Sequence, residues 1–552
     1  MRGDKVDFGD PGDAGPEPFD PETFIRPTET KSLNKVYFIG PYGRRVSFAS
    51  QQRRVLNTVW ALEETSRIKK GDRVAVVGAG LAGVMAAVAL AARGMRVFLY
   101  EEKPNALRVQ SQTNHRYVHP TINFWPDEAL RPSTRFPFFD WAAGVCDDIV
   151  KSVYDEWVEL RAILEEDNRL QKFHNNTAVD ALTPTPDGKV HVEARVKQRS
   201  GDFDAVVVTT GFGVEKILQN TQTVSYWQQD KVEDQVRDSA LERLLVSGTG
   251  DGGLIDVLRL LHSDFDAGRF CLQIAHELAI AGAAEPLADL EARVKQRFVA
   301  SYEATIAAAG EAAAQAALKS AMAVAADAYA EELDGYFEAW LPDGVEKLLD
   351  VSLIDDRGRQ VQLVGTLPHP YSMNSAPIHR VLIAHALRRK TLAYVSGSLD
   401  AAGTGLAIET PAELQDVFPE YAIARHGSNL PIERFIPDEA ERAALQALQE
   451  GASDWLRDDI VGAAYFRLDK YPPHDPTDDD FIISRLSRAE DYVKTFAGGN
   501  VSYTRKNGRR GLEVTPRPDK VLHRDKVPDE LFGITLHVSD RRPRFSTGTR
   551  KR

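Results

Sequence analysis

Three glycines early in the chain have the spacing of a phosphate-binding loop. Gly78, Gly80 and Gly83 form the pattern G-x-G-x-x-G, and they directly follow an apolar, β-branched run, Val74–Val77. In a dinucleotide-binding unit the first glycine permits a tight turn, the second admits a pyrophosphate, and the third lets the next helix pack on the strand. The N-terminus of that helix then faces the phosphates. We therefore expect a dinucleotide site at this turn.

An acid follows at the distance that such a unit requires. We expect the helix after the glycine loop to end at Gly94 and Val97–Tyr100 to form a second parallel strand. Glu101 comes directly after this strand, where a carboxylate can accept hydrogen bonds from a ribose. Because strand, helix, second strand and acid occur in order, a merely solvated strand end is the less favoured interpretation of Glu101.

A later strand completes the pattern of a flavoprotein. Residues Phe203–Gly213 read FDAVVVTTGFG, an apolar strand that ends in Thr209, Thr210 and Gly211. This run resembles the strand ending in A-T-G of FAD- and NAD(P)H-binding flavoproteins, where its glycine packs near the cofactor. The resemblance implies that the first glycine loop holds FAD and that Gly211 lies beside it. We expect two further strands before this run, His174–Leu182 and Lys189–Val196.

A second glycine pattern suggests a second nucleotide site. Leu244–Leu261 combines a short apolar strand, the glycines Gly248, Gly250 and Gly253, and an apolar-periodic helix. Two such units in this order resemble the two-dinucleotide-binding flavoproteins, which include flavin monooxygenases, N-hydroxylases and glutathione-reductase-like pyridine-nucleotide reductases. The resemblance implies NAD(P)H at the second loop.

The second unit departs from the pattern in two ways. Asp251 lies inside its glycine loop, where a carboxylate repels a pyrophosphate unless it points away or binds a ribose or a cation. No strand ending in an acid or arginine follows at the usual distance, because an Ala-rich helical segment, about residues 273–341, intervenes. The second loop could therefore be a nucleotide-free Rossmann repeat or a surface that touches the flavin. NADH and NADPH are not distinguished by these residues.

A long irregular segment supplies the candidate catalytic residues. Ser111–Trp141 is dense in His, Arg, Pro and aromatic residues, and a structured loop of this length is typical of a functional segment. By resemblance to glutathione-reductase-like and amino-acid-oxidase-like flavoproteins, His115, Arg116 and His119 should lie near the isoalloxazine ring. Arg116 could bind a pyrophosphate or a substrate carboxylate, and either histidine could relay protons. Alternatively, Arg116 caps backbone carbonyls and His119 only begins a turn before Pro120.

Other candidates carry weaker signals. In Pro368–Arg380 we expect a helix capped by Asn374 or Ser375, with Pro377 in its first turn. His426 follows an apolar strand, and a packed turn histidine is its favoured interpretation.

An amphipathic helix should precede the first strand. Gln51, Gln52 and Arg53 of Ser47–Ile68 could touch the cofactor from outside the Rossmann unit. The apolar stripe of this helix instead favours packing on the core.

Composition indicates a large soluble enzyme. The chain has 552 residues and a net charge of −13, which disfavours nucleic acid or an anionic membrane as the main partner. Its only cysteines, Cys146 and Cys271, are far apart, so redox chemistry should belong to a cofactor rather than to a C-x-x-C pair. We find no metal-ligand cluster and no apolar run long enough for a membrane span, and we expect a cytoplasmic protein.

These features predict an α/β architecture in four parts. A disordered tail, 1–30, should precede the first part of an FAD-binding domain, 31–240. A second Rossmann-like domain, 241–430, should contain the helical insertion and the strands 361–365, 392–397 and 421–427. Residues 431–552 should complete the flavin domain and end in a basic tail. We expect the insertion to serve packing or homo-oligomerisation rather than as a lid.

Three functions remain open from the sequence. The first is an FAD-dependent oxidoreductase that takes hydride from NAD(P)H, plausibly a monooxygenase acting on a small organic substrate. The second is an amine or amino-acid oxidase, in which the second glycine loop is structural and Arg116 holds a carboxylate. The third is a non-catalytic, flavin-binding sensor or interaction protein.

Overall fold

The computed structural model describes most of the chain. It covers residues 20–451, except 43–44, 132, 231, 237–238, 263–264, 266–268, 311–312 and 354–358. It also covers 465–466, 468, 470–471, 499–506, 509–516, 530–531 and 534–538. Residues 1–19 and the basic C-terminal tail lie outside the described residues. The expectation of a disordered tail over 1–30 is wrong for its last part, because Glu22–Ile25 form a short helix whose Phe24 and Ile25 are buried in an apolar cluster.

The first sheet surrounds the strand that carries the first glycine loop. Five parallel strands of the described chain have the order β1-β10-β2-β3-β6. Val74 and Val76 of β2 pack on one face with α2, α3 and α4, and Ala75 and Val77 pack on the other, as a strand buried on both sides requires. The elements are β1 (Val36–Phe38), β2 (Arg73–Val77), β3 (Arg96–Tyr100), β6 (Leu170–His174), β10 (Ala205–Val208), α2 (Phe48–Glu64), α3 (Leu81–Ala92) and α4 (Cys146–Glu166).

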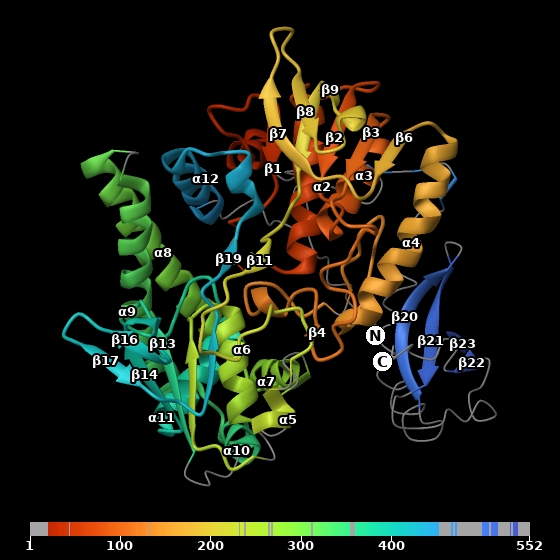
Figure 1. Cartoon of the computed structure of the whole chain (residues 1–552). Coiled ribbons are helices and arrows are strands. Elements are labelled where there is room, and N and C mark those ends of the chain that lie inside the picture. Colours follow the sequence, from red (N-terminus) through yellow and green to blue (C-terminus); the bar gives the residue numbers. More distant parts are fainter. Residues whose placement is uncertain are drawn as a thin grey trace, which may run out of the picture.

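One expected strand is in fact two. The interpretation of His174–Leu182 as a single strand is wrong, because β6 ends at His174 and a second strand, β7 (Val179–Pro184), begins after a turn. Asn176 has a φ of 49° in this turn, which redirects the chain from the parallel sheet. β7 then forms an antiparallel meander with β8 (Val190–Ala194) and β9 (Gly201–Phe203), which covers the other face of the first sheet (Figure 1).

A second parallel sheet has the expected strands. Its order is β14-β13-β12-β18, so the strands expected at 361–365, 392–397 and 421–427 do join the strand before the second glycine loop. One face packs against the helices α6 and α11, and the other packs against an antiparallel three-stranded sheet. The elements are β12 (Arg243–Ser247), β13 (Gln360–Gly365), β14 (Leu392–Ser396), β18 (Tyr421–Ala424), α6 (Asp251–Leu261), α11 (Pro377–Arg388), β15 (Ser398–Ala402), β16 (Gly405–Glu409) and β17 (Leu414–Val417).

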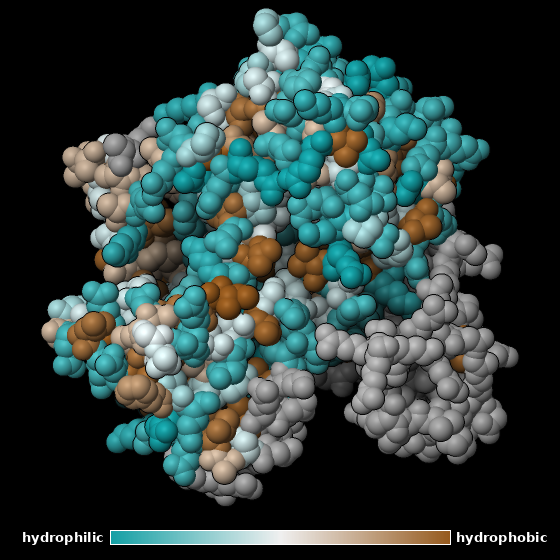
Figure 2. All heavy atoms as spheres, in the orientation of Figure 1, coloured by the Kyte–Doolittle hydropathy of each residue, from teal (hydrophilic) through white to brown (hydrophobic). Residues whose placement is uncertain are grey.

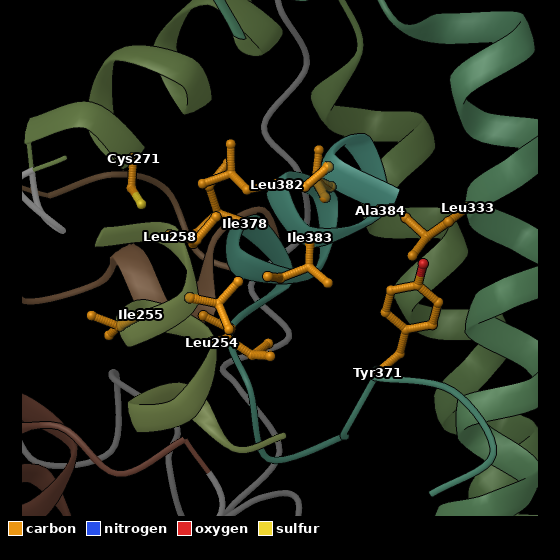
Figure 3. Packing of buried hydrophobic residues seen from close by; sticks show 14 of the residues in the cluster. Leu254, Ile255, Leu258, Cys271, Leu333, Tyr371, Ile378, Leu382, Ile383 and Ala384 are labelled. Atoms are coloured by element: carbon orange, nitrogen blue, oxygen red, sulfur yellow. The ribbon is translucent and has the colours of Figure 1, made fainter. Parts of the chain in front are cut away.

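The helical insertion lies within one crossover of the second sheet, between α6 and β13. It is longer than the sequence indicated and contains α7 (Arg269–Ile280), α8 (Ala284–Ala309), α9 (Ala314–Trp340) and α10 (Asp343–Ser352). α8 and α9 form the long helical pair in Figure 1. Leu333 of α9 belongs to the same buried cluster as Leu254 of α6 and Leu382 of α11, all labelled in Figure 3. The insertion is therefore packed into the core of the second domain.

The two domains are joined by a short antiparallel ribbon of β11 (Val214–Glu215) and β19 (Ser428–Asn429). After β19 the chain returns to the first domain, where Ile432 and Leu445 pack in the cluster that contains Val206 of β10. Figure 2 shows a largely hydrophilic face with apolar side chains gathered over its middle, where this ribbon runs in Figure 1.

The remaining elements are short or lie near the chain ends. They are α1 (Glu22–Ile25), η1 (Arg26–Thr28), β4 (Tyr117–Val118), η2 (Ile122–Phe124), β5 (Gly144–Val145), η3 (Lys197–Arg199), α5 (Val232–Val236), η5 (Pro431–Arg434), α12 (Glu439–Gly451), β20 (Gly499–Lys506), β21 (Arg509–Pro516), β22 (Glu530–Leu531) and β23 (Ile534–Val538). Among the described residues, no helix combines the length and the apolar character that a membrane crossing requires.

A buried carboxylate ties the insertion to both domains. Glu291 of α8 accepts hydrogen bonds from Arg380 of α11 (2.6 and 2.7 Å), from Arg45 of the first domain (2.9 Å) and from the Tyr329 hydroxyl (2.8 Å). Although burial opposes its charge, the two guanidinium groups lower the pKa of Glu291. The carboxylate is therefore the shared partner of two buried cations.

Replacement of this carboxylate should destabilise the fold. Glu291→Gln leaves the buried Arg380 guanidinium without its counter-charge and leaves Arg45 only the more distant Asp127 (3.4 Å). The substitution should lower the free energy of unfolding by about 3–5 kcal/mol in urea denaturation. Glu331→Gln is the matched control on the same helical pair, because Glu331 forms only an exposed ion pair with Arg297. Equal stability of the two variants would contradict this account of the insertion.

Candidate functional site

The first glycine loop is built by close backbone approach. Gly78 has a φ of 100°, and a Cβ there would lie 2.8 Å from the carbonyl oxygen of Thr209. A Cβ at Gly83 would collide with the carbonyl oxygen of Gly78, which is why α3 can begin so close to β2. A Cβ at Gly80 would meet no atom within 4 Å, so space remains in front of the helix N-terminus. This open cradle fits a pyrophosphate.

Glu101 closes the other side of this loop. Its carboxylate accepts hydrogen bonds from the backbone N–H groups of Ala79 (2.7 Å) and Lys103 (2.8 Å). Burial raises the pKa of Glu101, although both hydrogen bonds oppose this shift. Each carboxylate oxygen keeps further acceptor capacity for a ribose hydroxyl, so the acid can hold the loop and a ligand together.

The T-T-G turn supports the loop from the neighbouring strand. The Thr209 hydroxyl lies within hydrogen-bonding distance of the carbonyl oxygens of Gly78 (2.9 Å) and Val77 (3.0 Å). Gly211 follows in the same turn, and open space surrounds the position of its missing Cβ. The three segments named by the sequence therefore meet at one edge of the first sheet.

The second glycine loop repeats this geometry. Gly248 has a φ of 119°, and a Cβ there would collide with the carbonyl oxygen of Arg425, which directly follows the neighbouring strand β18. A Cβ at Gly253 would collide with the carbonyl oxygen of Gly248, whereas a Cβ at Gly250 would meet no atom within 4 Å. The backbone thus offers the same cradle in both units.

The register of the strands shows which residue replaces the acid in the second unit. Gly78 donates its N–H to Tyr100, and Glu101 follows; Gly248 donates its N–H to Val364, and Gly365 follows. The missing strand is therefore β13, displaced along the sequence by the insertion. A Cβ at Gly365 would lie 2.5 Å from the Thr249 side chain, so the second unit has no carboxylate at this position.

Asp251 points away from the second cradle. Its Oδ1 accepts a hydrogen bond from the backbone N–H of Ala376 (2.6 Å) and lies 2.8 Å from Nδ1 of His379. Burial opposes both charges, but their mutual attraction lowers the pKa of Asp251 and raises the pKa of His379 to about 10. At neutral pH the two side chains therefore form an ion pair.

The expected cap of α11 is wrong. Neither Asn374 nor Ser375 is the N-cap residue; Ala376 is, with Pro377 as the first helical residue. The Asp251 carboxylate performs the capping from another helix, because alanine has no side-chain acceptor.

His115 and His119 are buried and uncharged near neutral pH. Burial lowers the pKa of each to about 4, with the neighbouring Arg116 adding to the shift of His115. Nδ1 of His119 accepts hydrogen bonds from the backbone N–H groups of Thr121 and Ile122, both at 3.1 Å. His119 therefore caps a turn here, and proton relay by either histidine stays a prediction.

Arg116 lies between the two domains. Its Nε donates to the Tyr226 carbonyl oxygen (3.3 Å), its guanidinium stacks 4.0 Å from the Tyr226 ring, and Nη2 lies 3.4 Å from Asp256 of α6. Asp256 also pairs with Arg259 (2.9 Å) and Arg425 (2.7 Å). The sequence analysis did not single out Asp256 or Arg259, although a polar pair at i, i+3 within the apolar helix sequence LIDVLRLL was a usable signal.

The weaker candidates have structural partners. Gln52 hydrogen-bonds to the Phe139 carbonyl oxygen (2.9 Å) and to the indole of Trp141 (2.8 Å), and Arg53 pairs with Glu128 (2.9 Å). These contacts fix α2 against the Ser111–Trp141 segment. Gln51 donates to the Gly40 carbonyl oxygen (3.4 Å), and His426 lies 2.8 Å from the Ser247 hydroxyl. In the described part of the chain, no group of His, Cys, Asp and Glu side chains could hold a metal ion.

A family comparison agrees with the first unit. Residues 73–171 match the family model described as FAD dependent oxidoreductase. The match begins with β2 and ends within β6, so it includes the first glycine loop, Glu101 and the segment that carries Arg116. This part of the chain is therefore similar to FAD-dependent oxidoreductases. The expected resemblance to FAD-binding flavoproteins is confirmed for this part of the chain.

Solved structures and curated proteins were also compared. The bacillithiol disulfide reductase of Bacillus cereus is 9% identical, with 65% of this chain and 78% of that chain covered and a TM-score of 0.32. The T. acidophilum thioredoxin reductase is 11% identical, with 71% and 100% covered and a TM-score of 0.31. The water-forming NADH oxidase of Lactobacillus brevis is 13% identical, with 64% and 53% covered and a TM-score of 0.27. No curated protein sequence matches this chain.

The close approach at Gly83 gives a direct test of the first loop. Gly83→Ala should lower the free energy of unfolding by about 3 kcal/mol in urea denaturation, because the new methyl group meets backbone that cannot move aside. Gly144→Ala is the control, since its Cβ would meet no atom closer than 3.9 Å. If Gly83→Ala were as stable as the control, the packing of α3 on β2 described above would be incorrect.

Proposed function

We propose that this chain is an FAD-dependent oxidoreductase that takes hydride from NAD(P)H at the second glycine loop and acts on a small organic substrate as a monooxygenase. The observation that carries the proposal is the repeated loop geometry. Gly80 and Gly250 are each the N-cap residue of a helix and each face open space, and the glycines on either side make the same close backbone approaches. Two equal cradles fit two dinucleotides.

The cysteines support a small-molecule electron acceptor. The chain contains only Cys146 and Cys271, and both are buried and unpaired. Burial raises the pKa of Cys146, which keeps its thiol protonated and unreactive. The side chain of Cys271 lies in the apolar cluster of the second domain (Figure 3). Such thiols do not provide the exposed pair that a dithiol relay requires, so O₂ together with an organic substrate is the acceptor we propose.

The surroundings of Arg116 disfavour the amino-acid oxidase. In that alternative Arg116 holds the substrate carboxylate, but its guanidinium already lies 3.4 Å from Asp256 and 3.7 Å from Asp230. Two carboxylates balance its charge and would repel a third anion. Arg116 instead suits the role of holding the Ser111–Trp141 segment against the second domain.

Each part of the chain has a separate task in the proposed reaction. Bound FAD supplies the hydride and oxygen chemistry. The helix N-termini after Gly80 and Gly250 receive the two pyrophosphates, and Glu101 accepts a hydrogen bond from the adenosine ribose of FAD. The buried segment around Arg116 excludes water between the domains.

The absence of an acid at Gly365 bears on the nicotinamide coenzyme. A carboxylate at this position favours the free 2′-hydroxyl of NADH and repels the 2′-phosphate of NADPH. Since Gly365 carries no side chain, NADPH should bind at least as tightly as NADH. The check is an anaerobic titration of the FAD-loaded protein with each nucleotide, following the visible flavin band. Bleaching by NADH alone would contradict this expectation, and bleaching by neither nucleotide would refute the proposed hydride donor.

Two matched substitutions separate the sites. Gly80→Val should abolish FAD retention, because its side chain fills the first cradle. Gly250→Val should keep FAD and raise the KM for NAD(P)H at least about tenfold, equivalent to about 1.4 kcal/mol of lost binding. Flavin content of the purified variants and steady-state kinetics measure both effects. If Gly250→Val were reduced as readily as the wild type, the second loop would not be the nicotinamide site.

A further inference from the structure

The second glycine loop carries an acid where the first carries a leucine. G-A-G-L-A-G and G-T-G-D-G-G place Asp251 at the position of Leu81, and each is the first residue of its helix. Leu81 lines a small apolar cavity with Ile149 and Val150 of α4, the helix that follows the second strand of its unit. Asp251 contacts the corresponding helix of the second unit, α11. One helix contact is therefore apolar in the first unit and ionic in the second.

The partner of Asp251 is a histidine at an unusual place. His379 is the third residue of α11, within the positive N-terminal end of the helix, where a cationic side chain is unfavourable by itself. Its imidazole is buried, 4% exposed, and lies 2.8 Å from Oδ1 of Asp251. The carboxylate faces the N-termini of both α6 and α11, which attract it. The pair is thus a neutral unit between two helix ends.

Hydrogen bonds of Arg380 fix the first turn of α11, which carries His379. Arg380 donates to the Ser372 carbonyl oxygen (2.8 Å) and to both oxygens of Glu291. The Cys271 side chain also contributes to the raised pKa of His379. The insertion that supplies Glu291 therefore holds His379 against the glycine loop.

We propose that His379 is a positioning residue for the nicotinamide dinucleotide at the second glycine loop. Its imidazolium holds the Asp251 carboxylate against α11, which keeps this negative charge balanced and out of the space in front of Gly250. The pyrophosphate of the coenzyme then meets the N-terminus of α6 without a repelling anion. This inference rests on the proposed function, in which NAD(P)H binds at this loop.

The test is a double-mutant cycle on the FAD-loaded full-length protein with NADPH as the probe. In His379→Gln the carboxylate loses its counter-charge, and KM and Kd for NADPH should rise at least about tenfold, with flavin content unchanged. Adding Asp251→Asn to His379→Gln removes the repelling charge and should restore KM and Kd to within about threefold of the wild type. His385→Gln is the matched control: His385 is another buried histidine of α11, paired with Asp350 (3.1 Å) at the far end of the helix, and its loss should leave both values unchanged.

The outcomes separate the possible failures. If the wild type is reduced by neither NADPH nor NADH, the proposed function and this inference both fall. If the wild type is reduced but His379→Gln binds NADPH normally, or the added Asp251→Asn gives no rescue, only the role of His379 is overturned. If His379→Gln does not fold, Asp251→Asn alone is measured instead. NADPH binding at least as tight as in the wild type supports the proposal, and about tenfold weaker NADPH binding overturns it.

Discussion

The structure depends on how closely a helix can approach the strand before it. In both Rossmann units a glycine at the third loop position removes the Cβ that would strike the carbonyl oxygen of the first glycine. This approach directs the helix N-terminus at the open space beside the second glycine, where backbone N–H groups can meet an anion. The surrounding sheets and helices serve to hold this short turn. The first unit matches a family model of FAD-dependent oxidoreductases, and the second unit repeats the geometry of the turn.

The space between the units is filled by paired charges rather than by apolar side chains alone. Arg116 of the first domain reaches Asp256 of α6, and Arg45 reaches Glu291 of the insertion. Burial makes each of these charges costly unless its partner is present, so the relative placement of the domains is specified by complementarity. The insertion takes part in this arrangement and is not an appendage. Its carboxylate orders the first turn of α11, which stands beside the second cradle.

The two units share a backbone plan but differ in the chemistry of their side chains. Glu101 gives the first cradle a carboxylate for a ribose, whereas Gly365 leaves the second without one. Leu81 makes an apolar helix contact in the first unit, whereas Asp251 makes an ionic one in the second. A single fold can thus present two cradles of different side-chain chemistry, as the proposed FAD and NAD(P)H sites require. The difference lies in a few residues around otherwise equal turns.

The sequence by itself determined the features that depend on near neighbours along the chain. Both glycine loops, the strands and helices that flank them, the acid after β3 and the α/β class follow from local spacing and periodicity. Only the tertiary structure decided that β12 lies between β13 and β18, because the insertion separates β12 from these strands in sequence. It also decided that Asp251 pairs with His379, 128 residues away, and that Arg116 meets Asp256, 140 residues away. Tertiary packing determines such pairings, because local sequence propensity does not indicate which charged side chains will be buried next to each other.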